Sequence, residues 1–197
     1  MKMNKIYQRL FIFFILIFMG CAHTKITSIK NPESPPQKYN KVMVMANPTI
    51  SLSDRKCIET TMVKYIKEIG VFCESAIAIM PLKNYSSKEE FSQIAVEKGF
   101  NAVLFVDLSK IYYEDLNMPG SSSTYSNRMG SVTFYNAGQN VKLPRMDFQI
   151  SLLEMNPTRP VWTSSTHTSG GASVTFEKMI DSLSAKTASK LKEDGII

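Results

Sequence analysis

The alternation of short apolar runs with longer helical segments between Lys41 and Val106 restricts the fold more than any other feature of this chain. The runs are short and rich in aliphatic residues, which is typical of strands. The expected strands are residues 41–46, 76–80 and 102–106. Strands joined by helices should lie parallel, with right-handed crossovers. This half of the chain therefore predicts a β-α-β-α-β unit.

Both intervening helices carry start and stop signals in the sequence. Ser51 and Ser53 are N-cap candidates for the first helix, and Gly70 ends it. The second opens with a capping box at residues 87–90 and stops at Gly99. The inward faces are expected to hold Ile58, Met62, Tyr65, Ile66 and Ile69 in the first helix, and Phe91, Ile94 and Ala95 in the second.

The C-terminal part has a different pattern. Residues 146–152 alternate strictly between apolar and polar, which predicts a strand with one wet face. Asn156-Pro157 should turn the chain into an antiparallel partner at residues 161–168, and a last helix is expected to run from Thr175 or Phe176 to Asp194. The predicted fold is an α/β three-layer sandwich with the β-α-β-α-β start, an antiparallel C-terminal hairpin and a packed C-terminal helix. It forms a single domain over residues 41–197.

Residues 113–144 interrupt this domain with a segment rich in Gly, Ser, Asn and Tyr, interpreted as a mobile loop. A short strand at residues 131–135, turned by residues 136–138, is expected within it. Tyr, Met and Arg are enriched at interface cores, so the candidate partner-binding residues are Tyr112, Tyr113, Tyr125, Arg128, Phe134 and Tyr135. The segment is either a partner-docking loop, a strand pair added on assembly, or a floppy hairpin whose aromatic residues cover the sheet.

The N-terminus reads as an export signal. Residues 1–20 carry three basic and no acidic residues, an unbroken apolar run at residues 10–19, and Gly20 before Cys21. The run has ten residues, whereas a membrane-spanning helix needs about 20. Three interpretations are open. The segment could be an ordinary signal peptide in which Cys21 is incidental, it could be an uncleaved anchor, or it could precede a lipid attachment site at Cys21.

Residues 18–21, Phe-Met-Gly-Cys, resemble the lipobox of bacterial lipoproteins. The resemblance implies that Cys21 is acylated and becomes the new N-terminus, and Ala22 in place of Asp implies the outer membrane, facing the periplasm. Residues 22–40 are polar and contain prolines, so they are interpreted as a flexible tether of about 25 Å. A disordered tail without a role is the alternative.

From residue 41 onwards, the order of elements resembles a recurring envelope domain. Pro160-Val161-Trp162 followed by a strand rich in Ser and Thr is its sharpest motif. The same order occurs in the N-terminal domain of TolB, the curli-secretion lipoprotein, activator lipoproteins of penicillin-binding proteins and small uncharacterised lipoproteins. The resemblance implies a binding module rather than an enzyme, and it selects no partner.

Composition and motif searches exclude several other functions. The whole chain has a net charge of +6, and about +3 remains without residues 1–20, which with no basic stripe argues against nucleic-acid binding. Two histidines, His23 and His167, lack the spacing of a metal site, and no phosphate-binding glycine motif is present. Neither a metal nor a cofactor is expected.

The helix between Cys57 and Cys73 separates them by roughly 18–20 Å, so two buried thiols are favoured over a disulfide.

The sequence thus predicts a lipid-anchored, non-catalytic accessory protein of an envelope transport, secretion or cell-wall assembly. Its partners would be the membrane, through the lipid, and an envelope protein; self-association is left open. Two alternatives remain. One is an envelope hydrolase using His167 with a serine. The other is a lipoprotein that binds a lipid or small ligand at the strand ends near Ala46, Met80 and Asp107.

Overall fold

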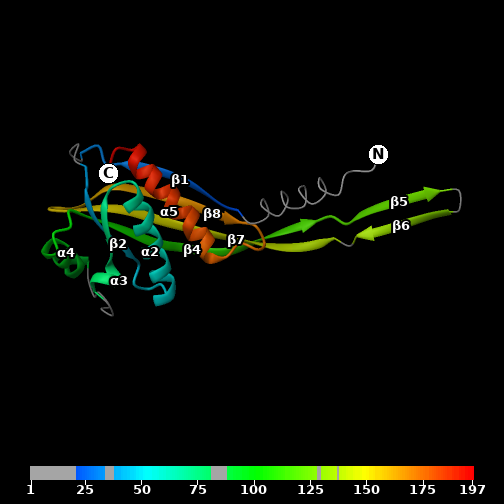
Figure 1. Ribbon diagram of the computed structural model, residues 1–197, viewed down its shortest axis with the longest axis horizontal. Coiled ribbons are helices and arrows are strands. Elements are labelled where there is room, and N and C mark those ends of the chain that lie inside the picture. The colour runs from blue at the N-terminus through cyan, green and yellow to red at the C-terminus, as the bar shows by residue number, and fades with distance from the viewer. Residues whose placement is uncertain (1–20, 34–37, 81–87, 128–129, 137) are drawn as a thin grey trace.

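A computed structural model describes residues 21–33, 38–80, 88–127, 130–136 and 138–197, and it confirms the α/β fold (Figure 1). A six-stranded mixed sheet has the strand order β1-β8-β7-β4-β2-β3, and β5 and β6 form a separate two-stranded ribbon. The elements are β1 (Ala22–Lys30), β2 (Lys41–Ala46), α2 (Leu52–Glu68), β3 (Phe72–Ser75), α3 (Ala76–Ile79), α4 (Lys88–Glu97), β4 (Ala102–Met118), β5 (Ser121–Asn127), β6 (Gly130–Asn136), β7 (Gln139–Met155), β8 (Thr158–Gly170) and α5 (Phe176–Glu193).

The parallel half follows the sequence signals. Strand β2 pairs in parallel with both β3 and β4. Ser51 caps α2 by accepting a hydrogen bond from the backbone N–H of Asp54, and Gly70 follows the helix at φ +90°. Gly99 takes the same role after α4, at φ +74°. Positive φ strains any residue with a Cβ, which is why glycine stands at both helix ends.

The antiparallel half also agrees with its pattern. Alternate residues of β7 are buried, from Met146 to Leu152, and β8 pairs back antiparallel along its length. Helix α5 is capped by Thr175 and packs on the sheet through Met179, Ile180, Leu183 and Leu191. Buried Trp162 on β8 donates its indole N–H to Asp194, the C-cap of α5, at 2.8 Å.

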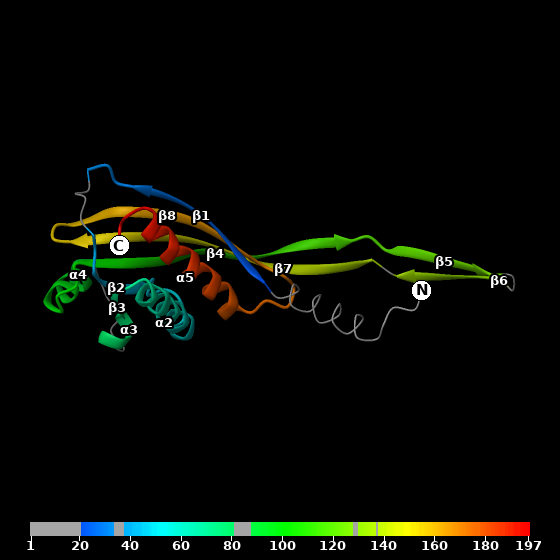
Figure 2. The same cartoon turned by 45° about the horizontal axis from the view of Figure 1, so that its top comes forward.

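Helices cover the sheet unequally. Helices α2 and α5 lie side by side on one face, over the larger apolar core (Figures 1 and 2). The opposite face has a smaller core, which joins α3 and α4 to β2, to the start of β4 and to the end of β7. These layers form the predicted sandwich. No helix among the described residues is long and apolar enough to cross a membrane.

The tether predicted from residue 22 is wrong over its first half. Residues 22–30 form β1, an edge strand paired antiparallel with β8 (Figure 2). Thr24 lies inward on this strand, and its hydroxyl is 3.0 Å from both the Thr168 and the Ser182 hydroxyls. The inward side of β1 mixes Ala22 and Ile26 with Thr24 and Ser28, and Ile29 lies on the exposed side, so no apolar alternation marked the strand in the sequence. Residues 1–20, interpreted as the export signal, and residues 34–37 of the predicted tether lie outside the described residues.

The strand expected at residues 76–80 is displaced. The strand itself is β3, at residues 72–75, and α3 begins directly after it. Ser75 caps this short helix by accepting from the N–H of Ala78, and the buried carboxylate of Glu59 accepts from the N–H of Ile77. These two acceptors favour a helical turn in an apolar run that would otherwise suit a strand.

The mobile loop expected at residues 113–144 is instead a long hairpin. Strands β4 and β7, each 17 residues long, pair along nearly their whole length, and β5 and β6 continue outward from them (Figure 1). The predicted reversal at residues 136–138 is also wrong. Ser121 pairs with Asn136 and Met118 with Gln139, so β6 runs on into β7 in one direction. The chain turns between Asn127 and Gly130, which face each other.

Candidate functional site

The hairpin projects beyond the rest of the sheet as an arm, defined as residues 113–127, 130–136 and 138–144. Strand β8 pairs with β7 only as far as Arg145, and β2 pairs with β4 only over residues 102–106. At 3.3 Å per residue, the 15 arm residues from Tyr113 to Asn127 span about 50 Å. Figures 1 and 2 both show the arm extending from one end of the body.

Apolar side chains are exposed where the arm leaves the body. Ile111 is 53% exposed and Tyr113 63% exposed, and both lie on the face that α2 and α5 cover further along the sheet. Leu116, 43% exposed, lies on the other face of β4. The sheet thus continues past its helical layer without a cover among the described residues.

The structure separates the two adjacent tyrosines that the sequence grouped as partner-binding residues. Tyr112 is half-buried and its ring centroid lies 6.5 Å from that of His167, while the Lys110 ammonium lies 4.6 Å from the Tyr112 ring centroid. Tyr113 points to the opposite face, because successive strand residues alternate.

The remaining predicted binding residues belong to the outer part of the arm. Tyr125 is on β5, paired with Val132, and Phe134 and Tyr135 are on β6, paired with Ser123 and Ser122. Arg128 lies outside the described residues. The backbone therefore places three of the six candidates on one ribbon.

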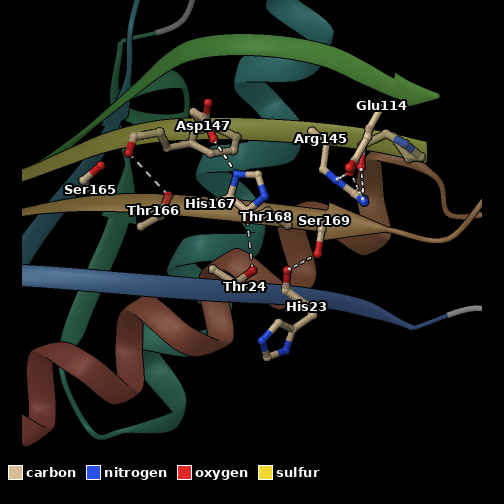
Figure 3. A network of polar contacts seen from close by, with 12 residues as sticks. His23, Thr24, Glu114, Arg145, Asp147, Ser165, Thr166, His167, Thr168 and Ser169 are labelled. Carbon is tan, nitrogen blue, oxygen red and sulfur yellow. Dashed lines mark hydrogen bonds and ion pairs between the residues drawn. The ribbon is translucent and has the colours of Figure 1, made fainter. Parts of the chain in front are cut away.

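Arg145 fixes the root of the arm, a role that sequence reasoning missed. Its Nε and Nη2 atoms donate to the Glu114 carboxylate at 2.9 and 2.6 Å (Figure 3). Its Nη1 atom donates to the carbonyl oxygens of Pro144 and Gly170, each at 3.2 Å. One guanidinium thus joins β4, β7 and the end of β8. The two residues of the ion pair are 31 positions apart, so only the strand register brings them together.

His167 has a carboxylate partner that the sequence did not reveal. Its Nδ1 atom lies 2.7 Å from the Asp147 carboxylate, which is directly opposite on β7 (Figure 3). No serine hydroxyl contacts the imidazole among the described residues, and the nearby Ser165 hydroxyl accepts from Gln149. The arrangement holds a base and an orienting carboxylate but lacks a bound nucleophile, which the hydrolase alternative requires.

The strand ends proposed as a ligand cleft are joined by direct contacts. The Asn47 side-chain amide donates to Asp107 at 2.6 Å, and its backbone N–H donates to the Val106 carbonyl. Ala46 is fully buried, and its N–H donates to Glu59. No group of His, Cys, Asp and Glu side chains in the described part of the chain could hold a metal ion.

Cys21 directly precedes β1 and is exposed. Ala22 pairs with Gly170, whose carbonyl oxygen accepts from Arg145 at the root of the arm. The predicted lipid attachment point and the arm therefore lie at the same end of the body.

Cys57 and Cys73 are free thiols, as the helix length between them predicted. Cys73 is fully buried, and burial raises the pKa of its thiol to about 12. Burial also raises the pKa of the half-buried Cys57 thiol, to a smaller degree.

These two thiols should differ in alkylation, because the thiolate is the reactive form. With iodoacetamide at pH 8, we expect mass spectrometry of the native protein to show slow labelling of Cys57 and none of Cys73. After denaturation without a reductant, both thiols should be alkylated. Equal labelling in the native state would contradict the burial of Cys73, and two unreactive cysteines after denaturation would indicate a disulfide.

Solved structures with this fold were found, although no family model and no curated protein sequence matches the chain. A PelC dodecamer from Paraburkholderia phytofirmans is 15% identical with a TM-score of 0.53, covering 85% of this chain and 96% of that one. A point variant of that PelC gives 16% identity, a TM-score of 0.52 and coverage of 85% and 98%. Lipoprotein GNA1162 from Neisseria meningitidis, at 9% identity, has a TM-score of only 0.42 over 77% and 97%. At these identities the likeness to PelC concerns the fold alone.

Proposed function

We propose that this chain is a lipid-anchored, non-catalytic accessory protein of a bacterial envelope assembly, and that it binds its partner through the arm. The observation that carries this proposal is the arm itself. It projects about 50 Å from a well-packed body and has no catalytic constellation along its described length.

The physical state of the arm supports a binding role. A two-stranded ribbon is marginally stable alone, and the outer edge of β4 is unpaired from Asp107 onward in the described structure. Unpaired strand edges are ready templates for further strands. Exposed Ile111 and Tyr113 add an apolar surface at the root. Binding would cover these residues and the open backbone edge together.

The position of Cys21 supports anchoring beside the arm. Residues 22–30 are a sheet strand, so an acyl group on Cys21 would hold the body close to the bilayer, without a long tether. The arm would then lie near the membrane surface, where tethering raises the effective concentration for its partner. The identity of Ala22 favours the outer membrane, facing the periplasm.

A second copy of this chain is the first partner to consider. The PelC structures that share this fold are dodecamers. Antiparallel pairing of one arm edge with a neighbour's arm would satisfy the open edges of both copies. An envelope protein of a transport, secretion or cell-wall assembly is the other partner class.

Shortening the arm should abolish partner binding and leave the body folded. Met118 and Gln139 face each other, so residues 119–138 can be replaced by Asn-Gly, which favours a tight hairpin turn. Crosslinking in intact cells, followed by identification of the joined proteins and size-exclusion of the extracted complex, should show the loss. We expect an unchanged thermal transition of the body.

A substitution pair gives a finer comparison. Ile111→Ser with Tyr113→Ser removes exposed apolar surface from the root of the arm, whereas Leu52→Ser with Val96→Ser removes comparable exposed surface from α2 and α4. Only the first pair should weaken binding. Retention of every partner by both arm variants would overturn the assignment.

A further inference from the structure

One part of the sheet is open on the side away from α2 and α5. Along β8, Ser164, Thr166 and Thr168 are buried toward α5, whereas Ser165 and His167 face the other way and reach the surface. The smaller core under α3 and α4 involves β2, the start of β4 and the end of β7. Beyond this core, the same face carries the polar side chains of Lys25, Lys110, Asp147, Gln149, Ser165 and His167.

Strand register places four charged or titratable residues in one row across this face. Lys25 on β1 faces His167 on β8, His167 faces Asp147 on β7, and Asp147 faces Lys110 on β4. Three strand spacings separate the two lysines by about 14 Å at their Cα atoms. Lysine side chains are long enough to reach inward over the central pair from both ends.

The hydrogen bonding in the row leaves donors available. The His167 imidazole bonds to Asp147 through Nδ1, and Nε2 has no partner among the described residues (Figure 3). Nε2 accepts in the neutral imidazole and donates in the imidazolium. Within the same described part of the chain, neither Lys25 nor Lys110 forms an ion pair; the Lys110 ammonium lies over the Tyr112 ring. The carboxylate that could neutralise a lysine is already engaged by the imidazole.

The row borders a shallow hollow of about 600 Å³. Its lining adds the hydroxyl groups of Thr27 and Ser165 and the amide of Gln149, which donates to Ser165 at 3.3 Å. Two lysines against one aspartate give the lining a net positive charge, and His167 adds a further one when protonated. The hollow is therefore polar, cationic and rich in hydrogen-bonding groups.

We propose that this hollow binds the oxyanion of a small ligand, a phosphate or carboxylate group held between Lys25 and Lys110, to which the Nε2–H of His167 adds a donor when the imidazole is protonated. Charge-assisted hydrogen bonds to an anion are stronger than neutral ones, and the flanking hydroxyl and amide groups would hydrogen-bond the rest of the ligand. Asp147 is a positioning residue that fixes the imidazole. This inference does not depend on the arm, because the hollow lies on the body.

Titration of the full chain with inorganic phosphate tests the proposal. The protein is kept in a nonionic polyoxyethylene detergent and Tris buffer at constant ionic strength, and the imidazole signals are followed by NMR. The His167 signals should shift saturably, whereas those of His23, which lies outside the hollow, should not. A parallel titration with acetate distinguishes a phosphate from a carboxylate ligand, and glucose provides a neutral comparison.

Matched double variants decide whether the lysines hold the anion. The double variant Lys25→Gln with Lys110→Gln should bind the preferred anion about tenfold or more weakly. Lys56→Gln with Lys178→Gln, which removes two exposed helix lysines, should leave the affinity unchanged. A non-saturable response, an equal response to glucose, or equal weakening in both double variants would overturn the proposal.

Discussion

Replacing Cys21 with alanine should move this protein from the membrane fraction to the soluble fraction. An acyl chain contributes about 0.8 kcal/mol per buried CH₂, so each long chain provides on the order of 10 kcal/mol of membrane affinity. Fractionation of cells followed by immunoblotting measures the change.

Two controls make the Cys21 result decisive. Cys57→Ala removes a half-buried thiol on α2 and should leave the protein membrane-bound. Mass spectrometry of the purified protein should show a chain that starts at Cys21 and carries added acyl mass. An unmodified thiol at Cys21, or a Cys21→Ala variant that stays in the membrane, would contradict lipid anchoring.

The largest expected effect on folding is that of Glu59→Ala. Glu59 lies on α2 and is fully buried, and its carboxylate accepts from the N–H groups of Ala46 at 3.0 Å and Ile77 at 2.8 Å. Arg55, also buried, lies 3.8 Å away. Alanine would leave two donors and a cation buried without their partner, so we expect a loss of about 3–5 kcal/mol in unfolding free energy.

Denaturant unfolding checks this loss, with Glu68→Ala as the matched control. Glu68 is an exposed glutamate on the same helix, so its removal should change stability by less than about 0.5 kcal/mol. Equal effects of the two substitutions would show that Glu59 does not join α2, β2 and α3.

The pH dependence of the same measurement gives a second readout for Glu59. Burial raises the pKa of its carboxyl above the usual 4.5, despite the hydrogen bonds from Ile77 and Ala46 that lower it. The native state thus binds this proton more tightly than the unfolded state. The stabilisation linked to it is complete below about pH 4.5 and is lost as the pH rises through the folded-state pKa. Glu59→Ala should remove this part of the pH dependence.

Local signals in the sequence predicted much of the body. Ser51 and Gly70 bound α2, Thr175 begins α5, and the alternation from Met146 to Leu152 placed β7 with the correct face inward. These signals act over a few residues, because caps and side-chain periodicity depend on nearby backbone geometry. The strand wrongly predicted at residues 76–80 shows the limit of such local signals. The Ser75 cap acts within its own turn, but the hydrogen bond from the Ile77 N–H to Glu59 links α3 to α2.

The candidate sites depended on long-range pairing. His167 was visible in the sequence, but its row with Lys25, Asp147 and Lys110 exists only because four strands come into register. The same is true of Arg145 and Glu114 at the root of the arm. Their partners lie on different strands, and a shift of one residue would move each side chain to the other face.

The sequence by itself determined the α/β class, the limits of α2 and the unpaired Cys57 and Cys73, and the export signal in residues 1–20 stays a prediction. Only the tertiary structure decided that residues 22–30 complete the sheet and that the described residues between 113 and 144 form an arm rather than a loop. Both segments mix polar and apolar residues without a strict alternation, so their own side-chain pattern does not specify them as strands. Their backbone hydrogen bonds are made with strands distant in sequence, which local composition does not encode.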